Sequence, residues 1–156
     1  TNNLNKDFNY ILTISTIYKQ KKKIITPITV MDGELPSLYP YSDRKNLFTL
    51  THAKYTHIKK FKSFKLLEHY KKKISKNDLV KRINKMEKSI ISFYPKFKKD
   101  LTYLGYFISY KVLPNEISAK RSISIKRNKN IVSCSSPKIA NIFEFENYIK
   151  KLIKLK

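Results

Sequence analysis

The stretch DFNYILTISTIYK, which begins at Asp7, alternates large apolar side chains with small polar ones along its length. In an extended chain Leu12 and Ile14 fall on one side, and Thr13 and Ser15 fall on the other. Period-two alternation of this kind is typical of a strand that buries one face. Strands with one buried face belong to antiparallel sheets. The pattern therefore predicts an antiparallel sheet early in the chain.

A second feature, TPITVMDGELPSLYPY at residues 26–41, combines an apolar run, an Asp32-Gly33 pair and a return that carries little charge. Gly33 supplies the positive φ that a tight hairpin requires, and Pro27 restricts its strand to an edge or a bulge. RKNLFTLTHAKYT then reads as a further strand. Residues 7–57 are therefore expected to form an antiparallel meander.

After residue 57 the sequence becomes rich in lysine and then shows the spacing of a helix. Residues 58–76 are dense in lysine and are expected to form a connector, and Asn77 is the expected N-cap of a following helix. LTYLGYFISYKVL is apolar on both faces, which predicts a central strand, and its Gly105 indicates a bulge or a close backbone approach. The helix after residue 77 is predicted from apolar residues at three-and-four spacing, among them Leu79, Ile83, Met86, Ile90 and Phe93.

RSISIKR and NIVSCS are expected to be short strands, and a closing helix is expected to bury Ile142, Phe145, Ile149, Leu152 and Ile153. The predicted fold class is α+β: a mostly antiparallel sheet, one amphipathic helix packed on it and a closing C-terminal helix. The length of 156 residues fits a single domain over 1–156, with residues 77–156 supplying the helix, later strands and closing helix.

The net charge of +23 is typical of chains that hold phosphates, but 30 of the 34 basic residues are lysine. Lysine and isoleucine have A/T-rich codons, so compositional bias of the genome is an equal explanation. No apolar run is long enough to span a membrane, and we expect a cytoplasmic protein. His52 and His57 have no Cys or acidic partners in the sequence, so no metal site is predicted, and no motif marks a catalytic residue.

The order of segments resembles the substrate domain of FAD-dependent oxidoreductases of the D-amino-acid oxidase type. The resemblance rests on the Asp-Gly hairpin, the return ELPSLYPY, the strand LFTLTHAKYTHI, the segment SIISFYPKFKKDLTYLGYFISYKVLP, SAKRSISI and NIVSCSSPKIANIFEFENYI. It covers residues 7–154. In that family a mostly antiparallel sheet covers the flavin, which would explain an uncharged hairpin in a basic chain.

The resemblance also implies site residues. Arg121 is the candidate anchor for a substrate carboxylate, and Tyr39, Tyr41 and His52 are candidates for the wall of the substrate site. The loop before the closing helix would approach the flavin, with Ser135, Ser136, Lys138 and Ile139 as cofactor-binding candidates. The family has a glycine before the lysine of this loop, whereas this chain has Pro137, which has no N–H to donate.

With Gly33 and Gly105 as its only glycines, the chain cannot form the glycine-rich turn that holds the FAD diphosphate. The expectation is therefore half an enzyme: the substrate-binding part of a flavin-dependent oxidoreductase acting on an amine or amino acid. It would require an FAD-binding domain in cis or trans and be inactive without it. The alternative is a lysine-rich nucleic-acid-binding module of a ribonucleoprotein, and non-specific nucleic-acid binding is expected in either case.

Overall fold

The computed structural model describes residues 8–21, 26–41, 46–114, 123–136 and 139–154, with the backbone alone at residues 114, 124, 135 and 154. The chain divides into two compact units, Thr1–Pro114 and Asn115–Lys156, and each is described by itself. The expectation of a single domain over residues 1–156 therefore stays a prediction.

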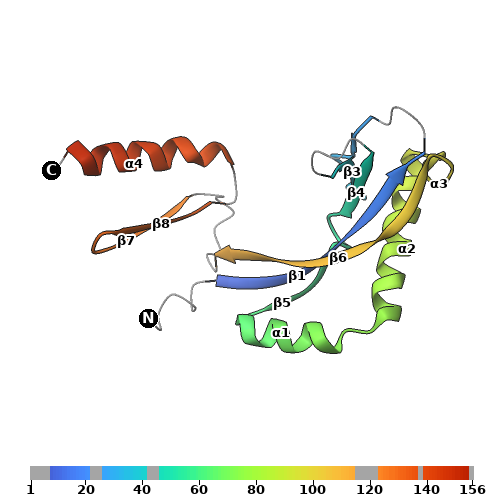
Figure 1. The fold of residues 1–156 in the computed structure, drawn as a ribbon, viewed down its shortest axis with the longest axis horizontal. Helices are drawn as coiled ribbons and strands as arrows, with labels where there is room; N and C mark the ends of the chain where they lie inside the picture. The colour runs from blue at the N-terminus through green and yellow to red at the C-terminus, as the bar shows by residue number, and fades with distance from the viewer. Residues whose placement is uncertain (1–7, 22–25, 42–45, 115–122, 137–138, 155–156) are drawn as a thin grey trace. The chain divides into compact units, whose positions relative to one another are not determined.

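The first unit is built on strand β1 (Phe8–Gln20), which lies at the centre of an antiparallel sheet (Figure 1). Strand β6 (Leu101–Pro114) pairs with β1 along its whole length. The other edge of β1 is shared by β5 (His57–Phe61) and β4 (Leu47–His52). The long alternating segment is thus a strand, as predicted, but it pairs with β4 and β5 rather than with the strand that follows it in sequence. The expectation of one buried face was wrong, because Thr13 and Ser15 on its polar side are also buried, at 3% and 9% exposure.

The outer part of this sheet is the hairpin of β2 (Ile28–Thr29) and β3 (Pro36–Pro40), which continues the sheet beyond β4. Gly33 has a φ of 77°, so the prediction of a hairpin closed by a glycine with positive φ is confirmed. The loop is longer than a two-residue turn, because the N–H of Val30 donates to the carbonyl of Pro36 at 3.1 Å. Leu35 in the same loop also has a positive φ, of 50°.

Gly33→Val is expected to lower the free energy of unfolding by about 1–2 kcal/mol, the cost of placing a side chain in left-handed backbone. A Cβ at this position would meet no atom within 4 Å, so backbone strain alone sets the loss. Gly33→Asn is the matched control, because asparagine tolerates this region better and should cost less. Denaturant titration measures both, and an equal loss in the two variants would show that φ is not the cause.

Three helices pack on one face of the sheet: α1 (Phe64–Lys73), α2 (Lys76–Phe93) and α3 (Phe97–Asp100). Helix α2 is the predicted amphipathic helix, but its N-cap is Ser75 rather than Asn77, since the Ser75 hydroxyl accepts from the N–H of Asn77 at 3.2 Å. The core between α2, α3 and the sheet contains Ile14, Tyr18, Leu38, Phe48, Leu50, Leu79, Ile83, Met86, Ile90, Phe97 and Leu101.

The lysine-rich segment 58–76 is not a plain connector. It contains most of β5 and all of α1, whose N-cap is Ser63 and whose Leu67 is fully buried. A single buried leucine and aromatic contacts such as Phe61–Tyr70, with ring centroids 5.3 Å apart, fix this short helix against the sheet. The lysines stay on its exposed side.

Strand β6 differs from the prediction of a central strand, because within the described residues it pairs with β1 alone and forms a sheet edge. The predicted bulge is confirmed: Tyr103 pairs with Tyr18 and Gly105 pairs with Ile17, so Leu104 is the extra residue. The bulge reverses the alternation of β6. Before the bulge, the odd-numbered Tyr103 faces the helices. After the bulge, the even-numbered residues of β6 face the helices.

The second unit contains a hairpin of β7 (Ser124–Asn128) and β8 (Ile131–Ser135), then a short 3-10 turn η2 (Ile139–Asn141) and helix α4 (Ile142–Lys154). The two short strands and the closing helix are as predicted. Ile142 and Ile153 were expected to be buried, but they are 60% and 68% exposed. The predicted α+β class with a mostly antiparallel sheet and a C-terminal helix is confirmed. None of the described helices is both long enough and apolar enough to cross a membrane.

Candidate functional site

The candidate site is the face of the first unit's sheet opposite the helices, which we call the open face. Within the described residues of that unit, α1, α2 and α3 all pack on the other side. A cavity of about 380 Å³ lies on the open face, framed by the β2–β3 hairpin, β4 and the bend that leads into β5. Seven of its 13 described lining residues carry a hydroxyl: Thr13, Ser15, Ser37, Tyr39, Thr51, Thr56 and Ser109. The hydroxyl of Thr56 donates to Sδ of Met86 at 3.8 Å.

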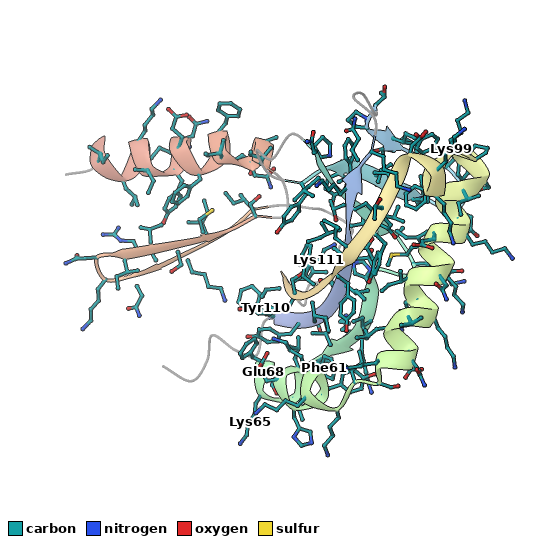
Figure 2. All side chains as sticks on the ribbon, turned by 45° about the vertical axis from the view of Figure 1, so that its right-hand side comes forward. Phe61, Lys65, Glu68, Lys99, Tyr110 and Lys111 are labelled. Atoms are coloured by element: carbon teal, nitrogen blue, oxygen red, sulfur yellow. The ribbon has the colours of Figure 1, made fainter. Side chains whose placement is uncertain are left out.

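A polar cluster crosses three neighbouring strands in this cavity. His57 on β5 and Ser109 on β6 flank Thr13 on β1, because both pair with it in register. The hydroxyls of Thr13 and Ser109 are 2.8 Å apart, and the ammonium of Lys111 lies 3.1 Å from Nε2 of His57. Figure 2 labels Lys111 next to Tyr110, which turns to the helix side and meets Phe64 edge to face. The cluster therefore places an imidazole, an ammonium and two hydroxyls on one side of the sheet, with Thr13 itself only 3% exposed.

The electrostatics of the cluster follow from its geometry. Burial lowers the pKa of His57 below its ordinary value, and the charge of Lys111 lowers it further. His57 is therefore a neutral imidazole near neutral pH, with Nε2 accepting from the Lys111 ammonium. The site thus combines one cation with one proton acceptor, a pair that can hold an anionic group and take up a proton.

The lowered pKa of His57 makes the free energy of unfolding depend on pH. Below about pH 6.5, the ordinary histidine value, the unfolded chain takes up a proton that the folded chain resists, so stability should fall as the pH is lowered. His57→Gln should flatten this dependence, whereas His69→Gln, at an exposed position on α1, should preserve it. Urea titrations at several pH values measure the difference, and identical profiles for wild type and His57→Gln would contradict it.

The predicted wall residues fall at or near this cavity. Tyr39 lines it and is 42% exposed. Tyr41 lies just past β3, and its ring meets Phe107 of β6 at 5.7 Å, so the contact passes over β4 and β1. Their role in binding a substrate stays a prediction.

His52 also lines the cavity, but it is 3% exposed and both ring nitrogens have partners within the chain. Nδ1 accepts from the N–H of Lys54 at 3.0 Å, and Nε2 lies 3.3 Å from a carboxylate oxygen of Glu34. Its ring also stacks on Tyr55 at 4.4 Å. In this geometry His52 holds the turn after β4, and its predicted contact with a substrate stays untested.

The other predicted site residues belong to the second unit. Arg121 and Lys138 lie outside the described residues. Ser135 ends β8, Ser136 follows it, and Ile139 begins η2 with 92% of its side chain exposed. Nothing in their geometry tests the proposed contact with a flavin.

Sequence reasoning missed His57, Lys111, Thr13 and Ser109 as a cluster. Thr13 was correctly placed on the polar side of β1, but Ser109 and Lys111 join that side only because of the bulge at Leu104. His57 was considered only as a metal ligand, and among the described residues no group of His, Cys, Asp and Glu could hold a metal ion. If the two-residue alternation of β6 is counted afresh from Gly105, Ser109 and Lys111 fall on the same face, and this was the signal that could have identified them.

Comparison with known proteins finds a distant relative. The chain is 28% identical over 126 residues to FAD-dependent monooxygenase FPY4 of Fusarium mangiferae, a match that covers 81% of this chain. The matched part is 34% of that protein, so the chain spans about a third of its length. No family model and no solved structure matches the chain. The chain is thus similar to part of an FAD-dependent enzyme, and this likeness is not specific to the D-amino-acid oxidase type.

Proposed function

We propose that this chain is the substrate-binding part of an FAD-dependent oxidoreductase, and that its open face forms the wall of the flavin and substrate site. The observation that carries the proposal is a sheet with helices on one face and a polar, cavity-bearing surface on the other. The distant likeness to an FAD-dependent monooxygenase supports the cofactor. The family resemblance of the sequence supports the same arrangement of sheet and flavin.

The described residues fit one part of FAD and not another. The isoalloxazine ring presents carbonyl oxygens and ring nitrogens at its polar edge. The exposed hydroxyl of Ser109, 2.8 Å from the buried hydroxyl of Thr13, can donate to such an atom. The diphosphate needs a glycine-rich turn at a helix N-terminus, which this sequence does not contain. We therefore assign the diphosphate to an FAD-binding domain in cis or trans and expect the chain alone to be inactive.

The substrate class that we propose is an amine or amino acid. When bound, FAD supplies the hydride acceptor for oxidation of a C–N bond. The chain's contribution is to bind and orient the substrate. A substrate carboxylate that pairs with the Lys111 ammonium would draw it away from His57, and the freed Nε2 could then accept a proton from the substrate amine. Arg121 remains a second candidate for the carboxylate anchor.

The test uses the protein that contains this chain together with its FAD-binding half. Lys111→Met should raise KM for amino acids by about 10- to 100-fold, the range expected when a hydrogen bond to a charged group is lost. Lys111→Arg, which keeps the charge, should have a smaller effect. The matching amines that lack the carboxylate serve as the internal control, and their KM should not change.

Flavin content is measured in each variant, so that lost cofactor binding is not mistaken for lost substrate binding. An equal rise in KM for amino acids and for their decarboxylated amines would contradict the role of Lys111. No oxidation of any amine or amino acid by the flavin-loaded wild-type protein would contradict the proposed substrate class.

A further inference from the structure

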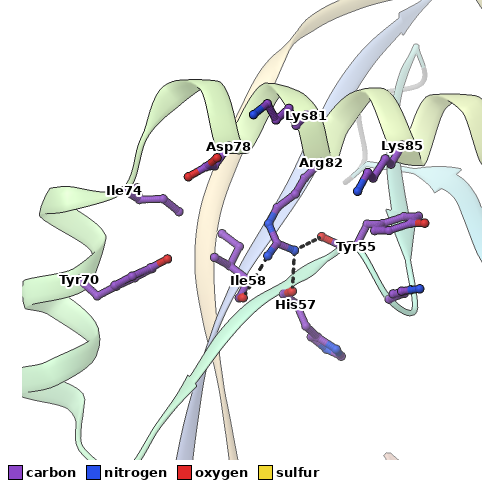
Figure 3. A pocket seen from close by; sticks show the side chains of 10 residues that line it. Tyr55, His57, Ile58, Tyr70, Ile74, Asp78, Lys81, Arg82 and Lys85 are labelled. Carbon is purple, nitrogen blue, oxygen red and sulfur yellow. Dashed lines mark hydrogen bonds between the residues drawn. The ribbon is translucent and has the colours of Figure 1, made fainter.

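A second cavity lies where helix α2 passes the outer edge of β5, and it shares His57 with the open-face cavity (Figure 3). We call it the α2–β5 cavity; its volume is about 450 Å³. Arg82 of α2 reaches β5 and donates to the carbonyls of His57 and Ile58, at 3.0 and 3.2 Å, and to that of Tyr55 at 3.4 Å. The ring of His57 points away from this side in Figure 3. The guanidinium of Arg82 is therefore held against β5 at the back of the cavity.

Positive charge gathers around this cavity. Lys54, Lys81 and Lys85 line it with Arg82, and Asp78 is the one carboxylate among the described lining residues. Within the part of the chain that the structure describes, none of the three lysines forms an ion pair. With four cations against one carboxylate, the positive charge of the lining predominates and raises the local concentration of anions. The cluster of cations around this cavity therefore favours binding of an anion that carries more than one negative charge.

The remaining lining is aromatic and aliphatic. Tyr55 is held by His52 on one side, and the ammonium groups of Lys54 and Lys85 lie 5.8 and 5.6 Å from its ring centroid. Tyr70, Ile58 and Ile74 complete the lining. Aromatic side chains beside cations are the combination that stacks nucleobases and holds the attached phosphates.

We infer that the α2–β5 cavity binds a nucleoside phosphate, with Lys54, Lys85 and Lys81 contacting the phosphates and Tyr55 or Tyr70 stacking on the base. Lysine acts as a point charge on phosphate, whereas a carboxylate ligand would favour a free arginine fork, and the fork of Arg82 is used on backbone carbonyls. The same chemistry is offered by a free nucleotide and by a nucleotide within a single strand. The inference does not depend on the proposed flavin function.

The experiment measures fluorescence anisotropy of two probes, labelled ADP and a labelled oligothymidylate, with the full-length protein at physiological salt. The test variant is Lys54→Gln/Lys85→Gln. The control is Lys65→Gln/Lys99→Gln, which removes the same charge from exposed lysines that do not line the cavity and are labelled in Figure 2. Tyr55→Leu tests stacking without any change of charge.

We expect saturable binding that weakens at least tenfold in Lys54→Gln/Lys85→Gln and in Tyr55→Leu, and less than twofold in the control. Binding of ADP would identify a free nucleotide as the source, and binding of oligothymidylate alone would identify a strand. If the test and control variants weaken probe binding equally, the effect is general counter-ion release and the inference is overturned. The absence of saturable binding of either probe would also overturn it. Flavin content and circular dichroism in every variant separate this outcome from misfolding and from the flavin proposal.

Discussion

Produced without an FAD-binding half, this chain is expected to purify colourless and to show no oxidase or monooxygenase turnover. The physical reason is the diphosphate of FAD, which needs backbone N–H groups at a glycine turn and a helix N-terminus. With Gly33 in a hairpin loop and Gly105 in a strand bulge, the chain's two glycines are used elsewhere. Joined to a dinucleotide-binding half, the chain should give a yellow protein. Visible absorbance of the purified proteins measures the difference.

The control for this experiment is the same dinucleotide-binding half produced alone. It should bind FAD more weakly than the joined protein and fail to oxidise substrate, because the wall supplied by the open face is missing. Tight flavin binding by this chain alone would contradict the division of labour that we propose. Unchanged flavin affinity and activity of the half on its own would contradict it as well.

The largest loss of stability is expected from the core between the sheet and α2. Leu50 on β4 is fully buried in the cluster that contains Phe48 and Met86, so Leu50→Ala should lower the free energy of unfolding by about 2–5 kcal/mol. The matched control is Leu104→Ala at the bulge of β6, where the leucine is 53% exposed. That change should alter stability by less than about 0.5 kcal/mol.

Chemical denaturation followed by circular dichroism measures both leucine variants. A loss at Leu104 as large as that at Leu50 would mean that another part of the protein covers β6. A loss at Leu50 below about 1 kcal/mol would contradict its place in a close-packed core, because even a well-relaxed cavity there should cost more.

The fold was predictable where a local pattern coincided with burial. Polar Thr13 and apolar Leu12 alternate because they lie on opposite faces of β1. Gly33 indicates a hairpin because glycine adopts a positive φ at little cost in free energy. The helix α1 was missed because its apolar residues, of which only Leu67 is buried, are mixed with an equal number of lysines. The edge position of β6 was missed because the sequence alone does not distinguish exposed aromatic side chains, such as Tyr110, from buried ones.

The candidate site was less predictable than the fold. Tyr39 was found because an uncharged hairpin suggested a wall, and the structure places it at the open-face cavity. The pair of His57 and Lys111 comes from strands far apart in sequence, and Lys111 reaches the open face only through the bulge at Leu104. A one-residue shift in register moves every later side chain to the other face, and no local pattern reports the pairing partner.

The measurement that tests the central claim most directly is the fluorescence lifetime of the bound flavin in two variants of the flavin-loaded protein. This chain contains no tryptophan, and the neighbours Tyr106 and Phe107 on β6 face opposite sides of the sheet. Indole quenches an excited flavin by electron transfer only at close contact. If the open face covers the flavin, Phe107→Trp shortens the flavin lifetime several-fold and Tyr106→Trp leaves it unchanged. Shortening by Tyr106→Trp alone, or by neither variant, would contradict the account.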